Sequence, residues 1–419
     1  MPATKFFSVT QRDGRWTFID PAGKLFYSLG VDCVTPSSVD KAQVDLVARY
    51  GRGGDWLEHW ADAKLAQLRT MGFNTLGAWH EPLYWPRTDM PKTVEIRMSR
   101  NCAKVNTTWG FGFPDVFDPS FDESIHNACT EMLYRNGGTK LIDDPSLIGW
   151  YTDNELHWWG ASGYWGGDDQ GTAADSSELV DDYINLKADK PGKKRWVRFL
   201  QERYGTIEKL NQAWDTEYPC FDDLHMVMYY RARADVLAGD KREFLRLVAE
   251  TYFQKTSAAL RLYVPNQLNL GTRVVGVSTP RVVLEVMGKY VDVVSLNTYS
   301  MTLPEQYFAH LHELTGKPIM LTEFAFCAGS RDGFAYNTNG ANSVLVANQQ
   351  RRCELYDKLV RRAAELPFMV GSHWFALYDY GNREGLIGNY GLLKLNDEPW
   401  PELCAAVART HAAIGTRSR

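Results

Sequence analysis

The sequence predicts a (β/α)8 barrel, and two observations carry the prediction. Short apolar runs of strand length recur along the 419 residues and alternate with stretches of helical character, which is typical of a parallel sheet. The runs are continuously apolar rather than alternating, as expected for strands buried on both faces. We find no repeat or linker, so a single domain over residues 1–419 is expected, and eight such units close into a barrel.

Seven strands are predicted in chain order at residues 24–34, 73–79, 146–152, 268–273, 291–299, 318–324 and 368–378. The barrel needs one more strand between residues 80 and 118, which we place at "VEIRMS", residues 94–99. Helices are predicted at 119–136, 195–215, 239–263, 279–289, 303–315, 342–364 and 399–413, and another ends at Gly72. Residues 1–23 are expected to form a β-hairpin that covers the bottom of the barrel. Residues 156–266 form a long helical insertion between strands four and five.

The composition is that of an ordinary globular protein. It is 44% apolar and 23% charged, with a net charge of −5, which disfavours nucleic acid and membrane partners. The seven cysteines form no CxxC pair, so we expect reduced thiols and no zinc cluster. The chain has no apolar leader and no apolar run of membrane-spanning length. We therefore expect a soluble, cytoplasmic protein, or a secreted one if a signal peptide has been removed. No cofactor is expected, and a homo-oligomer is left open.

Polar residues collect where the predicted strands end, the edge at which barrel enzymes place their active sites. The strand ends carry Trp79, His80 and Glu81 on strand two, Asp153, Asn154 and Glu155 on strand four, Arg273 on strand five, Asn297 and Tyr299 on strand six, Glu323 on strand seven, and His373 and Trp374 on strand eight.

Two of the glutamates among these residues are expected to face each other across the barrel mouth. Glu155 and Glu323 each follow an apolar run, and strands four and seven lie on opposite sides of a barrel. Hydrolysis of a glycosidic bond requires a carboxyl pair of this kind, one as proton donor and the other as nucleophile or base. Trp158 and the nearby Glu323 charge are expected to raise the pKa of Glu155, which keeps it protonated.

This arrangement resembles the clan A retaining glycoside hydrolases. The resemblance implies that Glu155 is the acid/base and Glu323 the nucleophile. It also implies that Asn154 binds the sugar 2-hydroxyl, that Tyr299 orients the nucleophile and that Trp374 is the sugar platform. Within the clan, "FGFPDVFDPSF", "LIGWYTDNEL", "GSHWFALYD" and "NYGLLKLNDEPWPEL" are similar to segments of glycoside hydrolase family 50, the β-agarases. "WVRFLQERYGTIEKLNQAW", residues 196–214, resembles the family 42 β-galactosidases.

The resemblance implies a retaining enzyme that cleaves β-galactosidic linkages in agarose-type or other galactan-derived oligosaccharides. The long insertion is expected to close one side of the pocket, so that cleavage proceeds from a chain end. A β-galactosidase or β-glucosidase of small glycosides is the alternative within the same class. A metal-dependent hydrolase and a non-catalytic carbohydrate-binding barrel are alternatives from other classes.

The remaining candidates each have two interpretations. Arg273 is either an ion-pair partner of Glu323 or a sugar ligand. His80 and Glu81 are hydroxyl ligands or structural residues, and His373 is a core histidine or a sugar contact. Trp158, Trp159 and Trp165 are stacking platforms or loop-packing residues, and Asp153 is expected to hold the strand end by hydrogen bonds.

Overall fold

Eight parallel strands close into a ring in the computed structural model, which describes residues 5–36, 45–51, 53–107, 112–162, 172–328, 344–382 and 385–415. Seven are β4 (Ser28–Val31), β5 (Thr75–Leu76), β6 (Lys92–Glu95), β7 (Leu147–Tyr151), β10 (Val294–Asn297), β11 (Ile319–Phe324) and β14 (Met369–Trp374). The remaining place is shared by β8 (Leu268–Asn269), which pairs with β7, and β9 (Val274–Val275), which pairs with β10. Since β8 and β9 are two ends of one segment, the order β8-β7-β6-β5-β4-β14-β11-β10-β9 closes on itself. The predicted (β/α)8 barrel is confirmed.

The third strand, β6, lies at residues 92–95 and so begins two residues before the predicted start. It opens on Lys92, whose side chain is fully buried. The Lys92 amine lies 2.5 Å from Asp144 and 2.6 Å from Ser146. The prediction began after Lys92 because a lysine is too polar to be expected in a buried strand. The ion pair with Asp144 allows this charge to be buried.

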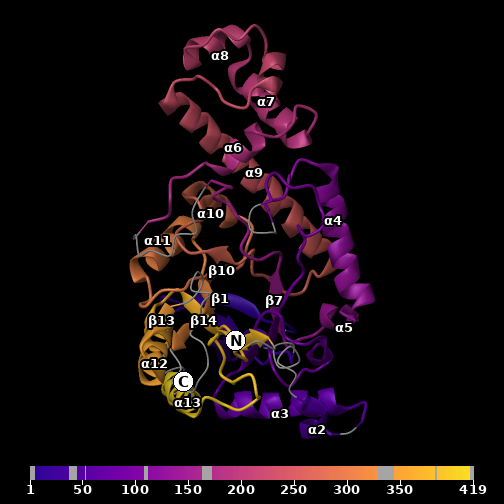
Figure 1. The fold of residues 1–419 in the computed structure, drawn as a ribbon, viewed down its shortest axis with the longest axis vertical. Coiled ribbons are helices and arrows are strands. Elements are labelled where there is room, and N and C mark those ends of the chain that lie inside the picture. The colour runs from indigo at the N-terminus through magenta and orange to yellow at the C-terminus, as the bar shows by residue number, and fades with distance from the viewer. Residues whose placement is uncertain are drawn as a thin grey trace.

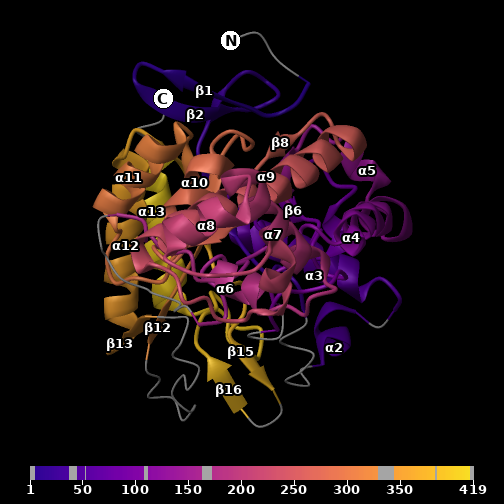
Figure 2. The ribbon, with the colours of Figure 1, turned by 90° about the horizontal axis from the view of Figure 1, so that it is seen from above.

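Helices cover the outside of the ring (Figures 1 and 2). They are α2 (Leu46–Tyr50), α3 (Trp56–Thr70), α4 (Pro119–Thr130) continued by a π-helical turn at Glu131–Arg135, α5 (Thr139–Ile142), α10 (Arg281–Met287), α11 (Glu305–Thr315), α12 (Gln349–Glu365) and α13 (Pro401–Gly415). A short 3-10 helix, η1, covers Pro82–Tyr84. The helix predicted from residue 342 begins at Gln349, because Asn348 caps it and residues 344–346 form strand β13 beside β12 (Phe326–Ala328).

The N-terminal strands cover the bottom of the barrel. β1 (Ser8–Arg12), β2 (Arg15–Ile19) and β3 (Leu25–Phe26) form an antiparallel sheet on one side of the ring, opposite β15 (Tyr380–Asn382) and β16 (Gly385–Gly388) (Figure 2). β1 and β2 form one hairpin and β2 and β3 form another, so this region holds one hairpin more than the single one predicted for residues 1–23. Phe7 and Phe18 pack against Ile148, Met320 and Val370 inside the ring, so the barrel is filled from below.

The segment between β7 and β8 holds the predicted helical insertion. It comprises α6 (Leu179–Ile184), α7 (Pro191–Tyr204), α8 (Ile207–Trp214), a 3-10 helix η4 (Phe221–Met226) and α9 (Ala234–Tyr263). The predicted helix 195–215 is two helices, because Gly205 has a left-handed φ of 77° and Thr206 caps α8. In Figure 1, α6, α7 and α8 lie at the top of the view, and α9 runs from them back to the barrel. In Figure 2 they lie between the N-terminal sheet and β15–β16, so the insertion projects from the side of the barrel. That the whole chain is one catalytic domain stays a prediction.

Candidate active site

The backbone is left-handed at five non-glycine residues around the barrel mouth. Cys33, Trp79, Arg97, Glu155 and Arg273 have φ values of 54°, 60°, 64°, 51° and 45°. The first four lie just beyond β4, β5, β6 and β7, and Arg273 lies between β8 and β9. Non-glycine residues rarely adopt this conformation. Such strain collects at functional sites, where the surrounding structure holds it in place.

Glu323 lies in β11, and both of its carboxylate oxygens have a partner. The Tyr299 hydroxyl donates a hydrogen bond to Oε2 at 2.5 Å, and Nη1 of Arg273 lies 2.8 Å from Oε1. The Glu323 side chain is 5% exposed. The carboxylate is therefore fixed in position and lies directly beside a buried positive charge.

Glu155 lies beyond the end of β7 and is only partly buried. Asn297 donates from Nδ2 to Oε1 of Glu155 at 2.9 Å and to Oδ1 of Asn154 at 3.2 Å. In the sheet register Asn297 is paired with Glu323. Asn297 thus lies between the two carboxyl groups, and Asn154 and Glu155 share its amide.

The two carboxyl groups have different electrostatic environments. Burial raises the pKa of Glu155 above its ordinary value of 4.5, and the negative charge of Glu323 raises it further. Burial also raises the pKa of Glu323, but the Arg273 guanidinium and the Tyr299 hydroxyl oppose that rise. A pair whose surroundings separate the two pKa values in this way has one member suited to donate a proton and one suited to stay ionised.

Arg273 connects the glutamate pair to Asp32, a residue that the sequence analysis missed. Nη2 of Arg273 lies 2.7 Å from Oδ2 of Asp32 and donates to the Thr322 carbonyl at 2.8 Å, while Nη1 donates to Oδ1 of Asn154 at 3.0 Å. Both side chains of the Asp32–Arg273 pair are completely buried. Arg273 is therefore the ion-pair partner rather than an exposed sugar ligand. The available signal for Asp32 was its position directly after the apolar run of β4.

A second group missed from the sequence surrounds Trp79. Its indole N–H donates to Glu95, which closes β6 and also pairs with Arg97 at 2.9 Å. The Arg273 guanidinium lies 4.4 Å from the centre of the Trp79 ring. The partly buried Phe375 ring lies edge-on to Trp79 at 6.3 Å. Glu95 was overlooked because the third strand was predicted to end at residue 99, four residues after its observed end.

Trp374 does not lie in the site, contrary to the role that the resemblance implied. Its side chain is 0% exposed, its indole N–H donates to the Tyr390 carbonyl at 3.0 Å, and Arg352 lies over its ring. Trp374 points out of the ring toward the core beneath α12, where it packs on Tyr356. Successive residues of a strand face opposite sides, and the next ring, Phe375, is the one near Trp79 and Tyr299.

Trp158 is also a core residue. It is 0% exposed and stacks on Phe253 of α9 with the ring centres 5.6 Å apart. Trp159 is buried and stacks on His157. Neither ring is available as a sugar platform. Trp165 lies outside the described residues.

The two candidate histidines, His373 and His80, are buried and each forms a hydrogen bond within the protein. His373 is fully buried inside the ring, where its Nε2 lies 2.8 Å from the Ser28 hydroxyl, and burial lowers its pKa to about 3. Nδ1 of His80 lies 2.8 Å from the Gly77 carbonyl, and burial lowers its pKa to about 4. Neither position supports the predicted sugar contact, although His80 lines the cavity described below. Glu81 accepts a hydrogen bond from Thr35 at 3.1 Å.

Asp153 holds the end of β7, as the sequence analysis expected. It accepts hydrogen bonds from the backbone N–H and the hydroxyl of Ser99, both at 2.8 Å. The Tyr252 hydroxyl of α9 donates to it at 2.6 Å. The long helix of the insertion is thereby attached two residues before Glu155.

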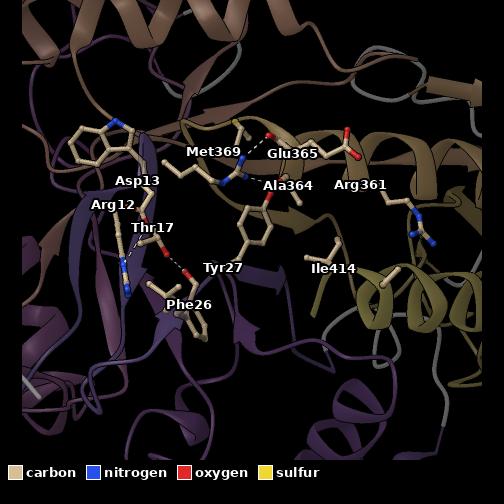
Figure 3. Close-up of a pocket in the computed structure, with 14 residues that line it drawn as sticks. Arg12, Asp13, Thr17, Phe26, Tyr27, Arg361, Ala364, Glu365, Met369 and Ile414 are labelled. Atoms are coloured by element: carbon tan, nitrogen blue, oxygen red, sulfur yellow. Dashed lines mark hydrogen bonds and ion pairs between the residues drawn. The ribbon is translucent and has the colours of Figure 1, made fainter. Parts of the chain in front are cut away.

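Two cavities lie at different ends of the barrel. One of about 250 Å³ opens beside the site and is lined by residues that include Trp79, His80, Glu95, Arg97 and Arg100. The larger, of about 740 Å³, lies at the bottom between the N-terminal hairpin and the ends of α12 and α13 (Figure 3). There the Arg15 guanidinium donates to the carbonyls of Ala364 and Glu365 at the end of α12, and Tyr27 stands in the middle of the view. Glu155, Glu323 and Arg273 lie at the opposite end of the barrel, at the C-terminal ends of the strands.

Within the described ranges no group of three or more His, Cys, Asp or Glu side chains is placed to hold a metal ion. No helix in this part of the chain is long and apolar enough to cross a membrane.

A (β/α)8 barrel with a glutamate after strand four and another on strand seven has the carboxyl pair that glycoside hydrolysis requires, and the relatives of the chain place it in the class of glycoside hydrolases. The family model of glycoside hydrolase family 42, described as beta-galactosidase, matches residues 116–329, and the chain belongs to this family.

Curated relatives of the chain include agarases as well as a galactosidase. Beta-agarase B of Vibrio sp. (strain JT0107) is 25% identical over 98% of this chain and 48% of its own length. Beta-galactosidase BgaA of Planococcus sp. (strain 'SOS Orange') is 29% identical over 50% of this chain and 32% of its own length. The chain thus spans half or less of the length of these curated relatives.

Solved structures give the same fold. An exo-beta-agarase superimposes with a TM-score of 0.84 at 22% identity, covering 99% of this chain and 66% of that one. PfGH50B superimposes with a TM-score of 0.85 at 22% identity, covering 99% and 67%. The predicted likeness to family 50, with a further likeness to family 42, is confirmed.

Proposed function

We propose that the protein is a retaining glycoside hydrolase that cleaves β-galactosidic linkages in agarose-type or other galactan-derived oligosaccharides. The observation that carries the proposal is the asymmetry of the carboxyl pair. Glu323 is fixed beside Arg273 and Tyr299, while burial and the Glu323 charge favour the protonated form of Glu155.

In the first step an ionised Glu323 oxygen attacks the anomeric carbon, and Glu155 protonates the departing glycosidic oxygen. The C–O bond to the leaving group breaks as the bond to Glu323 forms, which gives a glycosyl ester. The ester removes the Glu323 charge that had raised the pKa of Glu155. Glu155 is then a base that accepts a proton from water, and this water attacks the anomeric carbon and releases Glu323.

Other site residues serve this reaction by position. Asn154 is proposed to bind the sugar 2-hydroxyl, and Asn297 to hold Asn154 and Glu155 together. Tyr299 and Arg273 orient the nucleophile. Phe375 takes the platform role that had been given to Trp374, because it is the partly buried ring that contacts both Trp79 and Tyr299.

The galactan substrate is supported by the agarase names of the relatives and by the beta-galactosidase family model. Action from a chain end is supported by the exo-beta-agarase among the structural neighbours. The family model also favours a second candidate, a β-galactosidase of small glycosides.

A ladder of agaro-oligosaccharides tests the proposal. We expect a single short product from the earliest times, with longer chains shortened stepwise. A spread of intermediate lengths would contradict end-wise action. Cleavage of aryl β-galactosides without any action on the ladder would favour the β-galactosidase. Turnover of aryl β-glucosides alone would contradict the galactose assignment, and turnover of nothing in the panel would favour a binding protein.

A further inference from the structure

Glu95 is a third buried carboxylate near the catalytic pair, and the proposed mechanism does not use it. It ends β6 and is 7% exposed. Burial is the main cause that raises the pKa of Glu155 and of Glu323, and the negative charge of Glu95 adds to the rise at both. Burying a carboxylate is costly unless its oxygens are hydrogen-bonded, so the partners of Glu95 indicate its role.

Both donors that reach Glu95 bind the same oxygen. The Trp79 indole N–H and the Nε–H of Arg97 donate to Oε2, the latter at 2.9 Å. Within the described part of the chain no group donates to Oε1. Glu95 lines the cavity of about 250 Å³ beside the site. A carboxylate oxygen is a hydrogen-bond acceptor, so Oε1 is available to a donor on a ligand in this cavity.

Asp240 on α9 has the same kinds of partner but no free oxygen. Its Oδ2 accepts hydrogen bonds from the Trp214 indole and the Tyr204 hydroxyl, both at 2.7 Å. Nε of Arg203 lies 2.6 Å from Oδ1. Asp240 is 0% exposed, and both of its oxygens have partners within the protein. An indole and an arginine can therefore satisfy a buried carboxylate completely, whereas at Glu95 they leave one oxygen unpaired.

Contacts from Glu95 lead to the nucleophile. Its partner Trp79 lies against Arg273, whose guanidinium is 4.4 Å from the centre of the Trp79 ring. Nη1 of Arg273 lies 2.8 Å from Oε1 of Glu323. The wall formed by Glu95 and Trp79 is therefore next to the position of the sugar that becomes bonded to Glu323.

Arg97 adds hydrogen-bond donors to the same wall. It lines the cavity, its side chain is half exposed, and only its Nε–H is used on Glu95. The guanidinium therefore has further N–H groups for a ligand. A hydroxyl group both donates and accepts, so one sugar hydroxyl can donate to Glu95 and accept from Arg97. The partly buried Trp79 ring beside them offers an apolar surface.

We propose that Glu95 is a specificity-determining residue that accepts a hydrogen bond from one free hydroxyl of the galactose unit bonded to Glu323. This inference rests on the proposed function, which supplies the sugar. Asn154 is assigned the 2-hydroxyl, so Glu95 takes the 3-, 4- or 6-hydroxyl. A sulfate ester at that carbon has no hydrogen to donate, and it brings a second negative charge to the carboxylate. The substrate class is therefore a β-galactoside that is unsubstituted at that carbon.

Deletion of single hydroxyls tests the proposal. kcat/KM is measured for an aryl β-galactoside and its 3-, 4- and 6-deoxy analogues, with wild type and Glu95→Gln. For the wild type, one analogue should lose about 10- to 100-fold, as expected for a hydrogen bond to a charged group. For Glu95→Gln, the same analogue should lose less than about threefold, because the two changes remove one contact. A residue that only positions Trp79 would lower kcat/KM for all four substrates alike.

Asp240→Asn is the matched control, since it alters a buried carboxylate that also binds an indole and an arginine. It should lower Tm and leave the ratios between the four substrates at their wild-type values. Equal deoxy penalties in wild type and Glu95→Gln would overturn the proposal. Wild-type hydrolysis of all three deoxy analogues at the parental rate would overturn it without any variant. So would ready hydrolysis of the sulfate ester at the carbon that the deoxy series identifies.

Failure of the proposed function would be seen separately. If the wild type hydrolysed β-glucosides and no β-galactoside, the galactose assignment would be wrong, and the deoxyglucoside series would decide the role of Glu95 by the same comparison. If the wild type hydrolysed nothing, calorimetric affinities for methyl β-galactoside and its deoxy analogues would replace kcat/KM. Equal affinities for these ligands in wild type and Glu95→Gln would then overturn the role of Glu95.

Discussion

Arg273 gives the two glutamates different surroundings although they lie in one small site. Its guanidinium pairs directly with the Glu323 carboxylate, whereas its direct hydrogen bond with Glu155 joins the two backbones, from the Glu155 N–H to the Arg273 carbonyl at 3.2 Å. Asp32 holds its other nitrogen and limits how far the guanidinium can move. Since both side chains of the Asp32–Arg273 pair are 0% exposed, salt screens this pair much less than it screens an ion pair on the surface.

The two glutamates are expected to respond differently to truncation. Glu155→Ala should lower kcat/KM by about 10²–10⁴-fold on substrates with poor leaving groups. It should affect activated aryl glycosides much less, since these need no proton. Azide should restore turnover and give a β-glycosyl azide. Glu323→Ala should abolish hydrolysis of both substrate kinds, and azide should not give a retained product. Equal losses from Glu155→Ala on both substrates would mean that the roles are misassigned.

Glu155 should also make stability depend on pH. Because its pKa is raised in the folded state, folding favours the protonated form. The stability this provides is fully present below pH 4.5, the ordinary pKa, and is lost as pH rises through the raised value. Glu155→Gln stays neutral at all pH values. Its Tm should equal that of the wild type in acid and exceed it increasingly at neutral and alkaline pH.

Thermal melts of the two proteins in parallel buffers across this range provide the measurement. Asp13→Asn is the control, since Asp13 lies in the exposed β1–β2 turn at the other end of the barrel. A constant Tm difference between Glu155→Gln and wild type at every pH would contradict a raised pKa at Glu155.

At the scale of the strand, β14 shows why its side chains could not be assigned from the sequence. "GSHWFALYD" gives His373, Trp374 and Phe375 in succession, and the pattern of a strand buried on both faces does not indicate which faces the mouth. The structure places His373 inside the ring, Trp374 toward α12 and Phe375 near Trp79. The resemblance therefore implied the platform role for Trp374, one residue before Phe375, the ring that lies near Trp79 and Tyr299.

Substitutions in β14 should separate packing from function. Trp374→Phe should lower Tm, because it removes the hydrogen bond to the Tyr390 carbonyl and leaves unfilled volume in the core. Its kcat/KM should stay near the wild-type value. Phe375→Ala should lower kcat/KM while Tm changes little, since this ring is only partly buried. A large loss of kcat/KM in folded Trp374→Phe, with none in Phe375→Ala, would return the platform role to Trp374.

Over the whole molecule, the alternation of apolar runs and helices was enough to predict the barrel and the strands that carry both glutamates. Three features could not be predicted, because each depends on a contact between segments that are far apart in the sequence. The buried Lys92–Asp144 pair concealed the start of β6. Asp32 is recognisable only through Arg273, more than two hundred residues later in the chain. Trp158 is revealed as a core residue only by Phe253 on α9.

Trapping the covalent intermediate tests the central claim most directly. A 2-deoxy-2-fluoro-β-galactoside with an activated leaving group slows the second step, so that the glycosyl ester accumulates. Peptide mass spectrometry should then find one fluorogalactosyl group per chain, on Glu323, and the label should be absent from Glu323→Ala. A label on another residue, or none at all from an enzyme that turns over the unfluorinated galactoside, would contradict Glu323 as the nucleophile of a retaining mechanism.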